Sequence, residues 1–220
     1  MDASQPGTST HTAAAALELR HERLGLAAYE ATWQHMRAFT ETRGPAAADR
    51  LWTLQHPPVF TLGLNGRREH LLAPGEIPVI PVDRGGQVTY HGPGQLVVYP
   101  LLDIRRRRLG IRALVTLLEQ AVVSLLAEEG VTGRARPEAP GVYVEGAKVA
   151  SVGLRIRRGC SYHGLSVNVD MDLTPFSLIN PCGYAGLPVT DLKGLGVTLA
   201  VATAEDRLTA LIRDTLEAGG

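Results

Sequence analysis

The sequence contains only two cysteines, Cys160 and Cys182, in 220 residues. Two cysteines cannot form the disulfide framework of a small secreted protein, and thiols in the cytoplasm stay reduced. Net charge is absent as well, because 22 basic residues balance 22 acidic ones. A general nucleic-acid binder needs a basic surface, so we expect no nucleic-acid partner. The two thiols therefore remain open to metal binding, reactivity or simple packing.

Long apolar runs are also missing. No run approaches the roughly 18 residues that a membrane-spanning helix needs. Residues 1–12 lack the cationic stretch and apolar block of a secretory signal. We therefore expect a cytoplasmic protein without a membrane partner. Residues 1–16 are rich in small and polar side chains and predict a disordered tail, and residues 17–220 predict a single domain.

Motifs for metals and nucleotides are not found. The sequence has no Cys-x-x-Cys, and no two histidines lie four residues apart, so a zinc site is not expected. The glycine-rich segment 84–95 lacks the Gly-Lys-Ser/Thr of a nucleotide P-loop. We therefore expect no metal and no cofactor.

Apolar periodicity predicts three helices, over residues 26–43, over residues 111–130, and from Thr203 as N-cap to the end. Runs rich in strand-forming residues predict six strands, at residues 50–55, 78–82, 95–99, 141–145, 148–157 and 162–169. Gly146 predicts a hairpin between the fourth and fifth of them. Because the strands gather in the middle and do not alternate with helices, the pattern favours an α+β fold.

Cys182 is the more interesting thiol. It lies in segment 180–186, where proline and glycine residues on both sides predict a turn. A thiol on such a turn is placed to react, whereas Cys160 lies at the start of a predicted strand. Since a free cysteine is most often buried and inert, this context alone leaves Cys182 between a nucleophile and a packing residue.

A nucleophilic thiol needs a nearby cation or base, and three side chains are candidates: Lys148, His91 and His163. In a strand over residues 148–156, Lys148 falls on the apolar face, where a lysine is costly unless it is paired. Alternatively, the strand begins one or two residues later and Lys148 is a solvated turn residue. His163 falls on the apolar face of the next strand, with Leu165, Val167 and Val169, where the alternative to catalysis is a hydrogen-bonded core histidine.

Four consecutive arginines occupy residues 105–108. One interpretation is a solvated loop before the second helix. The other is a dock for an acidic carrier protein, where exposed charge would act mainly on the rate of association.

Several segments together resemble the lipoyl(octanoyl) transferases, also called octanoyl-acyl carrier protein:protein N-octanoyltransferases. The resemblance covers residues 17–196 and depends on the order and spacing of five segments, none of which is specific alone. These are His-Pro-Pro-Val-Phe-Thr-Leu-Gly at residues 56–63, Arg-Gly-Gly at 84–86 continuing to Tyr-His-Gly-Pro-Gly-Gln at 90–95, Gly-Ala-Lys-Val-Ala-Ser-Val-Gly at 146–153, His-Gly-Leu at 163–165, and Asn-Pro-Cys-Gly at 180–183.

The resemblance implies a mixed β-sheet flanked by helices, the fold of the biotin and lipoate protein ligase catalytic domain. It implies that Cys182 carries the acyl group as a thioester and that Lys148 favours the thiolate form of Cys182. It also implies substrate contacts at Arg84, Gly85, Gly86, Gln87, Val88, Thr89, Tyr90 and His91, at Ser151, Val152 and Gly153, and at Gly164, Leu165 and Ser166. His91 is expected to orient the thioester or Lys148.

The same resemblance implies the substrates. Octanoyl-acyl carrier protein would donate an octanoyl or lipoyl group. The acceptors would be apo lipoyl domains of 2-oxoacid dehydrogenase E2 subunits and the glycine cleavage H protein, in the first step of protein lipoylation. One alternative is an ATP-dependent lipoate or biotin ligase of the same fold. A second alternative is a non-catalytic protein that binds lipoyl domains or acyl carrier protein.

Overall fold

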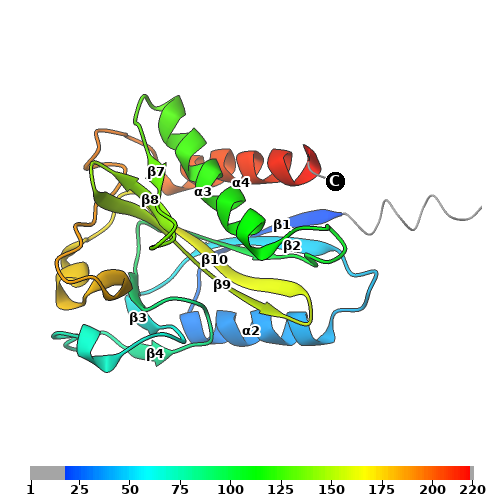
Figure 1. The fold of residues 1–220 in the computed structure, drawn as a ribbon, viewed down its shortest axis with the longest axis horizontal. Helices are drawn as coiled ribbons and strands as arrows, with labels where there is room; N and C mark the ends of the chain where they lie inside the picture. The colour runs from blue at the N-terminus through cyan, green and yellow to red at the C-terminus, as the bar shows by residue number, and fades with distance from the viewer. Residues whose placement is uncertain (1–17, 219–220) are drawn as a thin grey trace, which may run out of the picture.

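The computed structural model describes residues 18–218, so the expected tail at residues 1–16 lies outside the described part. Seven strands form the main sheet (Figure 1), in which β1 pairs with β2 in parallel and every other neighbouring pair is antiparallel. The sheet is therefore mixed, as predicted. In spatial order the strands are β1 (Leu19–Leu26), β2 (Asp49–Gln55), β6 (Gln95–Leu101), β10 (Cys160–Asn168), β9 (Ala147–Arg157), β8 (Gly141–Val144) and β7 (Arg134–Ala135).

A smaller sheet and three short 3₁₀ turns lie beside one end of the main sheet (Figure 1). The small sheet has the order β4 (Val79–Pro81), β3 (Val59–Leu62) and β5 (Val88–His91). The turns are η1 (Arg68–His70), η2 (Thr174–Leu178) and η3 (Pro181–Gly183). Phe60, Tyr90 and Phe176 pack together and join the small sheet to η2. This packing holds the segment that leads into the Cys182 turn against the small sheet.

Helices cover both faces of the main sheet (Figure 1): α3 (Ile111–Glu128) and α4 (Val201–Ala218) lie on one face, and α2 (Tyr29–Thr42) lies on the other. The side chains of β6 alternate accordingly. Leu96 and Val98 join the core under α3 and α4, whereas Val97 and Tyr99 pack with Met36 of α2. The α+β class and the flanking helices are confirmed. Within residues 18–218 no helix is both long and apolar enough to cross a membrane.

Several elements differ from the sequence-based expectation. Strands β3 and β7, which are only four and two residues long, were not predicted. Strand β1 was not predicted, because most of its side chains are exposed at the edge of the sheet and show no apolar alternation. The prediction that Thr203 caps the last helix is wrong. The Ala200 carbonyl already accepts a helical hydrogen bond from the Ala204 N–H, so the helix begins at Val201.

Asp49, at one end of β2, binds three arginine side chains. Its fully buried carboxylate accepts hydrogen bonds from Arg43 (2.6 Å), Arg106 (2.8 Å) and Arg107 (2.5 Å). A buried carboxylate is costly without such partners. The interpretation of residues 105–108 as a solvated loop is therefore wrong for Arg106 and Arg107, whose charges are already paired inside the protein.

The other two arginines of the run, Arg105 and Arg108, are exposed. Arg105 lies against Gly159 in the turn between β9 and β10, where an added Cβ atom would meet the arginine side chain at 2.4 Å. Lys148 lies at the opposite end of β9, about 30 Å away along the strand at roughly 3.3 Å per residue. A carrier protein bound at residues 105–108 would therefore have to extend over this distance to bring its acyl group to Lys148.

Replacing Arg106 and Arg107 together by alanine should lower the free energy of unfolding by about 3 kcal/mol, because Asp49 then keeps only Arg43 and the backbone N–H of Asp103 as hydrogen-bond partners. The matched control is Arg105→Ala with Arg108→Ala, which should change stability by no more than about 0.5 kcal/mol. Urea denaturation measures both. Equal midpoints for the two variants would show that the Asp49 cluster does not stabilise the fold.

Candidate active site

Cys182 lies at the centre of η3 in an unusual backbone conformation. Its φ of 57° and ψ of 15° are left-handed, which costs a non-glycine residue roughly 1–2 kcal/mol. Hydrogen bonds on both sides hold the turn: the Asn180 N–H donates to the His70 carbonyl (2.8 Å), and the Gly183 N–H donates to the Asn180 carbonyl (2.9 Å). The predicted turn is confirmed, and these hydrogen bonds hold the backbone that carries the thiol.

Lys148 reaches the sulfur of Cys182. Its Nζ donates to Cys182 Sγ at 2.8 Å and to the Pro140 carbonyl at 3.0 Å. Lys148 is the second residue of β9 and is only 3% exposed, so the alternative of a solvated turn residue is wrong. This buried lysine does have the partner that its burial requires.

The backbone explains why two residues 34 positions apart meet. After the Cys182 turn the chain runs beside β9 and forms a parallel bridge between Val189 and Lys148. The Lys148 N–H donates to the Pro188 carbonyl (2.8 Å), and the Thr190 N–H donates to the Lys148 carbonyl (3.0 Å). This pairing fixes the cysteine turn relative to the lysine.

The Lys148 ammonium has two hydrogen-bond acceptors in this arrangement, the Cys182 sulfur and the Pro140 carbonyl oxygen. Within residues 18–218 no carboxylate oxygen lies within 4.0 Å of Lys148 Nζ, so none competes with the sulfur as an ion-pair partner. The ring of Tyr143 lies 5.3 Å from Nζ and adds a cation–π contact.

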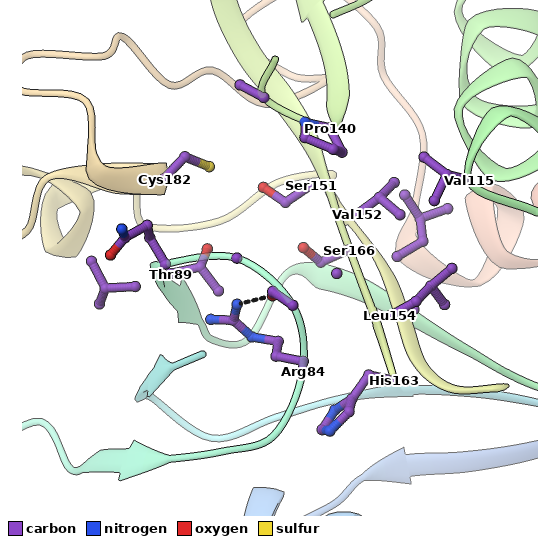
Figure 2. Close-up of a pocket in the computed structure, with 18 of the residues that line it drawn as sticks. Arg84, Thr89, Val115, Pro140, Ser151, Val152, Leu154, His163, Ser166 and Cys182 are labelled. Atoms are coloured by element: carbon purple, nitrogen blue, oxygen red, sulfur yellow. Dashed lines mark hydrogen bonds between the residues drawn. The ribbon is translucent and has the colours of Figure 1, made fainter. Parts of the chain in front are cut away.

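A cavity of about 440 Å³ opens beside Cys182 and Lys148. Figure 2 shows Cys182 on one side of this cavity and Val115 and Leu154 on the opposite side, with Ser151 and Ser166 between them. The cavity therefore has a reactive end and an apolar end, the arrangement expected for a ligand with a reactive head and an apolar chain.

The substrate-binding residues predicted from the sequence converge on this cavity, with one exception. Those that line it are Arg84, Gly85, Gly86, Gln87, Val88, Thr89, His91, Ser151, Val152, Gly153, Gly164, Leu165 and Ser166. Tyr90 does not line it, and its ring packs instead with Phe60 and Phe176. Contact with substrate stays a prediction for the residues that line the cavity.

Some of the wall was not anticipated. Tyr29, Asn65, Val97, Tyr99 and Tyr184 line the cavity from distant elements, as do Ile111 and Val115 at the start of α3. Ile111 and Val115 belong to the apolar stripe of this helix, and the sequence does not distinguish side chains that line a cavity from those that pack in the core.

Comparisons with known proteins identify the family of this chain. The family model of the lipoyl protein ligase A/B catalytic domain matches residues 28–213. The chain belongs to this family. Its relatives include the octanoyltransferase of Alkalilimnicola ehrlichii, 67% identical over 174 residues (79% of this chain and 81% of that protein), and that of Chromobacterium violaceum, 59% identical over 187 residues (85% and 90%). The resemblance inferred from the sequence is confirmed, and the chain is an acyltransferase.

Solved structures of the lipoyl protein ligase family share the fold. The crystal structure of lipoate-protein ligase A bound with ATP aligns with a TM-score of 0.73 at 16% identity, over 91% of this chain and 86% of that chain. Biotin protein ligase from Aquifex aeolicus aligns with a TM-score of 0.54 at 12% identity, over 92% and 70%. These likenesses confirm the predicted biotin and lipoate ligase-like fold.

In this family member the Arg84–Gly86 loop is anchored to strands on both sides. The buried Arg84 donates to the carbonyl and hydroxyl of Thr61 (2.7 and 2.8 Å) and to the Gly85 carbonyl (2.9 Å). Burial lowers the pKa of Arg84. The Gly85 N–H donates to the Leu154 carbonyl of β9 (2.9 Å). An added Cβ atom at Gly63 would lie 2.4 Å from the Gly86 carbonyl oxygen, so only glycine fits there.

The two candidate histidines lie in the cavity wall but do not bond to the Cys182–Lys148 pair. His91 is buried, which holds its pKa well below the usual value, and its Nδ1 lies 2.6 Å from Gln95 Oε1. No hydrogen bond joins His91 to Lys148 in the described part of the chain. His91 therefore bonds to other residues and does not make the expected contact with Lys148.

His163 is a hydrogen-bonded core histidine. The prediction that it shares a face with Leu165 is wrong, because a φ of 56° interrupts the alternation of β10 and places its ring beside Tyr99 and Tyr162. Its Nε2–H donates to Asp83 at 3.0 Å. Burial lowers the pKa of His163, with Asp83 opposing that effect.

Cys160 differs from Cys182 in its surroundings. It is buried at the first position of β10, and burial raises the pKa of its thiol. No group of three or more His, Cys, Asp or Glu side chains is placed to hold a metal ion in residues 18–218. Neither thiol therefore lies in a metal-binding cluster there.

His56 beneath the cavity should make stability depend on pH. Its Nδ1–H donates to the Ala27 carbonyl (2.6 Å), its Nε2 accepts from Tyr99 (2.8 Å), and burial lowers its pKa from 6.5 to about 4. The unfolded chain therefore binds a proton at a pH where the folded chain does not, and acid favours unfolding. As the pH falls from 6.5 to 4, protonation of this group in the unfolded chain should lower the free energy of unfolding by about 3 kcal/mol.

Urea denaturation at pH 4.5 and pH 7 measures the effect. His56→Gln should reduce the difference in stability between the two conditions. The exposed His35 offers the control His35→Gln, which should keep the wild-type difference. A His56→Gln variant with an unchanged pH difference would contradict the assignment.

Proposed function

We propose that the chain transfers an octanoyl or lipoyl group from acyl carrier protein to a lysine of apo lipoyl domains, through a thioester on Cys182. The observation that carries the proposal is the 2.8 Å contact between Lys148 Nζ and Cys182 Sγ beside a cavity with an apolar end. The octanoyltransferases at 67% and 59% identity support the acyl group.

In the first step the Cys182 thiolate attacks the carbonyl carbon of the octanoyl thioester. A carbon–sulfur bond forms on Cys182, and the bond to the pantetheine sulfur of the carrier breaks. The Lys148 ammonium donates its proton to the departing sulfur and becomes a neutral amine. Octanoyl then remains on Cys182, while the carrier leaves as a free thiol.

In the second step the ε-amine of the acceptor lysine attacks the new thioester. An amide bond forms, Cys182 leaves as thiolate, and the neutral amine of Lys148 takes the proton from the acceptor nitrogen. This returns the pair to its starting charges. The step is downhill because an amide is more stable than a thioester, and no ATP is needed because the acyl group arrives activated.

The apolar end of the cavity suits a medium chain. Burying the seven carbons beyond the carbonyl would contribute about 5 kcal/mol at roughly 0.8 kcal/mol per methylene. Val115, Val152 and Leu154 lie opposite Cys182 in Figure 2 and are the side chains we assign to this contact. We place the reaction in the cytoplasm, with E2 lipoyl domains and the glycine cleavage H protein as acceptors.

Intact-protein mass spectrometry tests the proposal. Mixing the protein with octanoyl-acyl carrier protein and no ATP should add one octanoyl group to the wild type and to Cys160→Ser. Cys182→Ser should stay unmodified. Modification only in the presence of ATP and free octanoate would instead favour an ATP-dependent ligase, and binding of a lipoyl domain without any adduct would favour a non-catalytic partner.

A further inference from the structure

A buried carboxylate behind Lys148 takes no part in the steps above. Glu119 of α3 is only 7% exposed, and its Oε1 accepts the backbone N–H of Gly141 at 2.8 Å. Burial raises the pKa of Glu119, while the Gly141 hydrogen bond and the charge of Lys148 act in the opposite direction. A carboxyl group is costly to bury, and no basic side chain lies within 4.0 Å of it in residues 18–218.

Glu119 holds the backbone segment against which the Lys148 side chain packs. Gly141 follows Pro140, whose carbonyl accepts the Lys148 ammonium at 3.0 Å. A Cβ atom on Gly141 would lie 2.6 Å from Lys148 Cε and 2.2 Å from the Ala150 carbonyl oxygen, and its φ is 141°. The lysine side chain therefore lies directly against this backbone, with no space left between them.

A second hydrogen bond secures the same segment. The Tyr143 hydroxyl donates to the Ala139 carbonyl at 2.8 Å, and the ring of Tyr143 lies near the Lys148 ammonium. The Val152 N–H of β9 also donates to the Pro140 carbonyl, at 3.4 Å. Residues 139–141 are thus held by β8, β9 and α3 together.

We propose that Glu119 is a positioning residue for Lys148, acting through Gly141 and the Pro140 carbonyl. By fixing the Gly141 N–H, its carboxylate holds that carbonyl in place, and the carbonyl directs the ammonium at the sulfur of Cys182. Glu119 forms no ion pair with Lys148 within 4.0 Å in the described residues, so it does not compete with the thiolate. This inference rests on the proposed role of the Cys182–Lys148 pair.

Three variants separate the hydrogen bond from the charge. Glu119→Gln keeps an acceptor for the Gly141 N–H and loses the charge, whereas Glu119→Asp keeps the charge and is too short to reach. Glu119→Ala loses both. The control is Leu118→Ala, on the same helix and fully buried in the main core, which lowers stability without touching Gly141.

We expect Glu119→Ala and Glu119→Asp to lower kcat about tenfold with KM for octanoyl-acyl carrier protein within about twofold, because a small displacement of a catalytic group slows chemistry more than binding. Glu119→Gln should stay within about threefold of the wild type. Leu118→Ala should melt at a lower temperature yet keep kcat within about twofold. Glu119→Asp serves as the test where Glu119→Ala does not fold.

A substrate-free readout separates this inference from the proposed function. The rate at which iodoacetamide alkylates Cys182, followed by mass spectrometry, should fall in the same order as kcat. If the wild type forms no octanoyl adduct, the proposed function fails while the alkylation rates still test Glu119. Wild-type rates in Glu119→Asp, equal losses in Glu119→Gln and Glu119→Ala, or an equal loss in Leu118→Ala would each overturn the positioning role.

Discussion

Cys182→Ala is expected to lower the rate of octanoyl transfer by about 10⁴-fold or more, because the proposed mechanism then loses the covalent carrier of the acyl group. The left-handed turn at Cys182 and its contact with Lys148 give the thiol its direction and its charge partner. The rate is measured with octanoyl-acyl carrier protein as donor and an apo lipoyl domain as acceptor, by the mass of the modified domain.

The control for this loss is Cys160→Ala. Cys160 is buried at the start of β10, so its replacement should cost some stability and leave kcat within about threefold. Substantial transfer by Cys182→Ala would mean that acceptor lysine attacks the carrier thioester directly. In that case the thioester on Cys182 is not an intermediate.

Lys148→Met should slow transfer by about 10²–10³-fold, since in the proposed mechanism the same group protonates the departing sulfur and accepts the proton of the acceptor amine. Methionine is similar in length and tolerates the buried position, so the fold should persist. The two half-reactions are measured separately: formation of octanoyl-Cys182 by intact mass, then its loss on addition of a lipoyl domain. Both should be slow.

Combining the two substitutions distinguishes a working pair from two independent effects. Residues that act as a unit give non-additive losses, so the Cys182→Ala/Lys148→Met protein should be no slower than Cys182→Ala alone. A further hundredfold loss in the double variant would show that Lys148 acts on another group. Lys148→Arg adds a check, because a guanidinium keeps the charge but does not serve as a base.

The local features of this protein were predictable because they depend on short-range geometry. Helix α3 follows from its apolar stripe, and the β8–β9 hairpin follows from Gly146 between two strand-like runs. The Cys182 turn follows from the proline and glycine beside it. In each case a few neighbouring residues restrict the backbone angles or define an apolar face, so no distant contact is needed to read the element.

Features that combine distant residues were not readable from local patterns. Residue pattern alone left Lys148 open between a buried partner and a solvated turn, and only the family resemblance linked it to Cys182. The His163 side chain does not lie on its predicted face, because the left-handed backbone of His163 interrupts the alternation of β10. Arg106 and Arg107 looked like surface charge, yet a single buried aspartate far away in the sequence pairs with both.

The sequence by itself determined the class of fold, the turn that carries the thiol and, through its resemblance, the family. The tertiary structure alone decided that the ammonium of Lys148 lies against the sulfur of Cys182, and that Glu119 holds the backbone behind it. The physical reason is that these contacts depend on strand pairing and helix packing between segments far apart in the chain. Such pairing decides which side chains meet, and a one-dimensional pattern carries no such information.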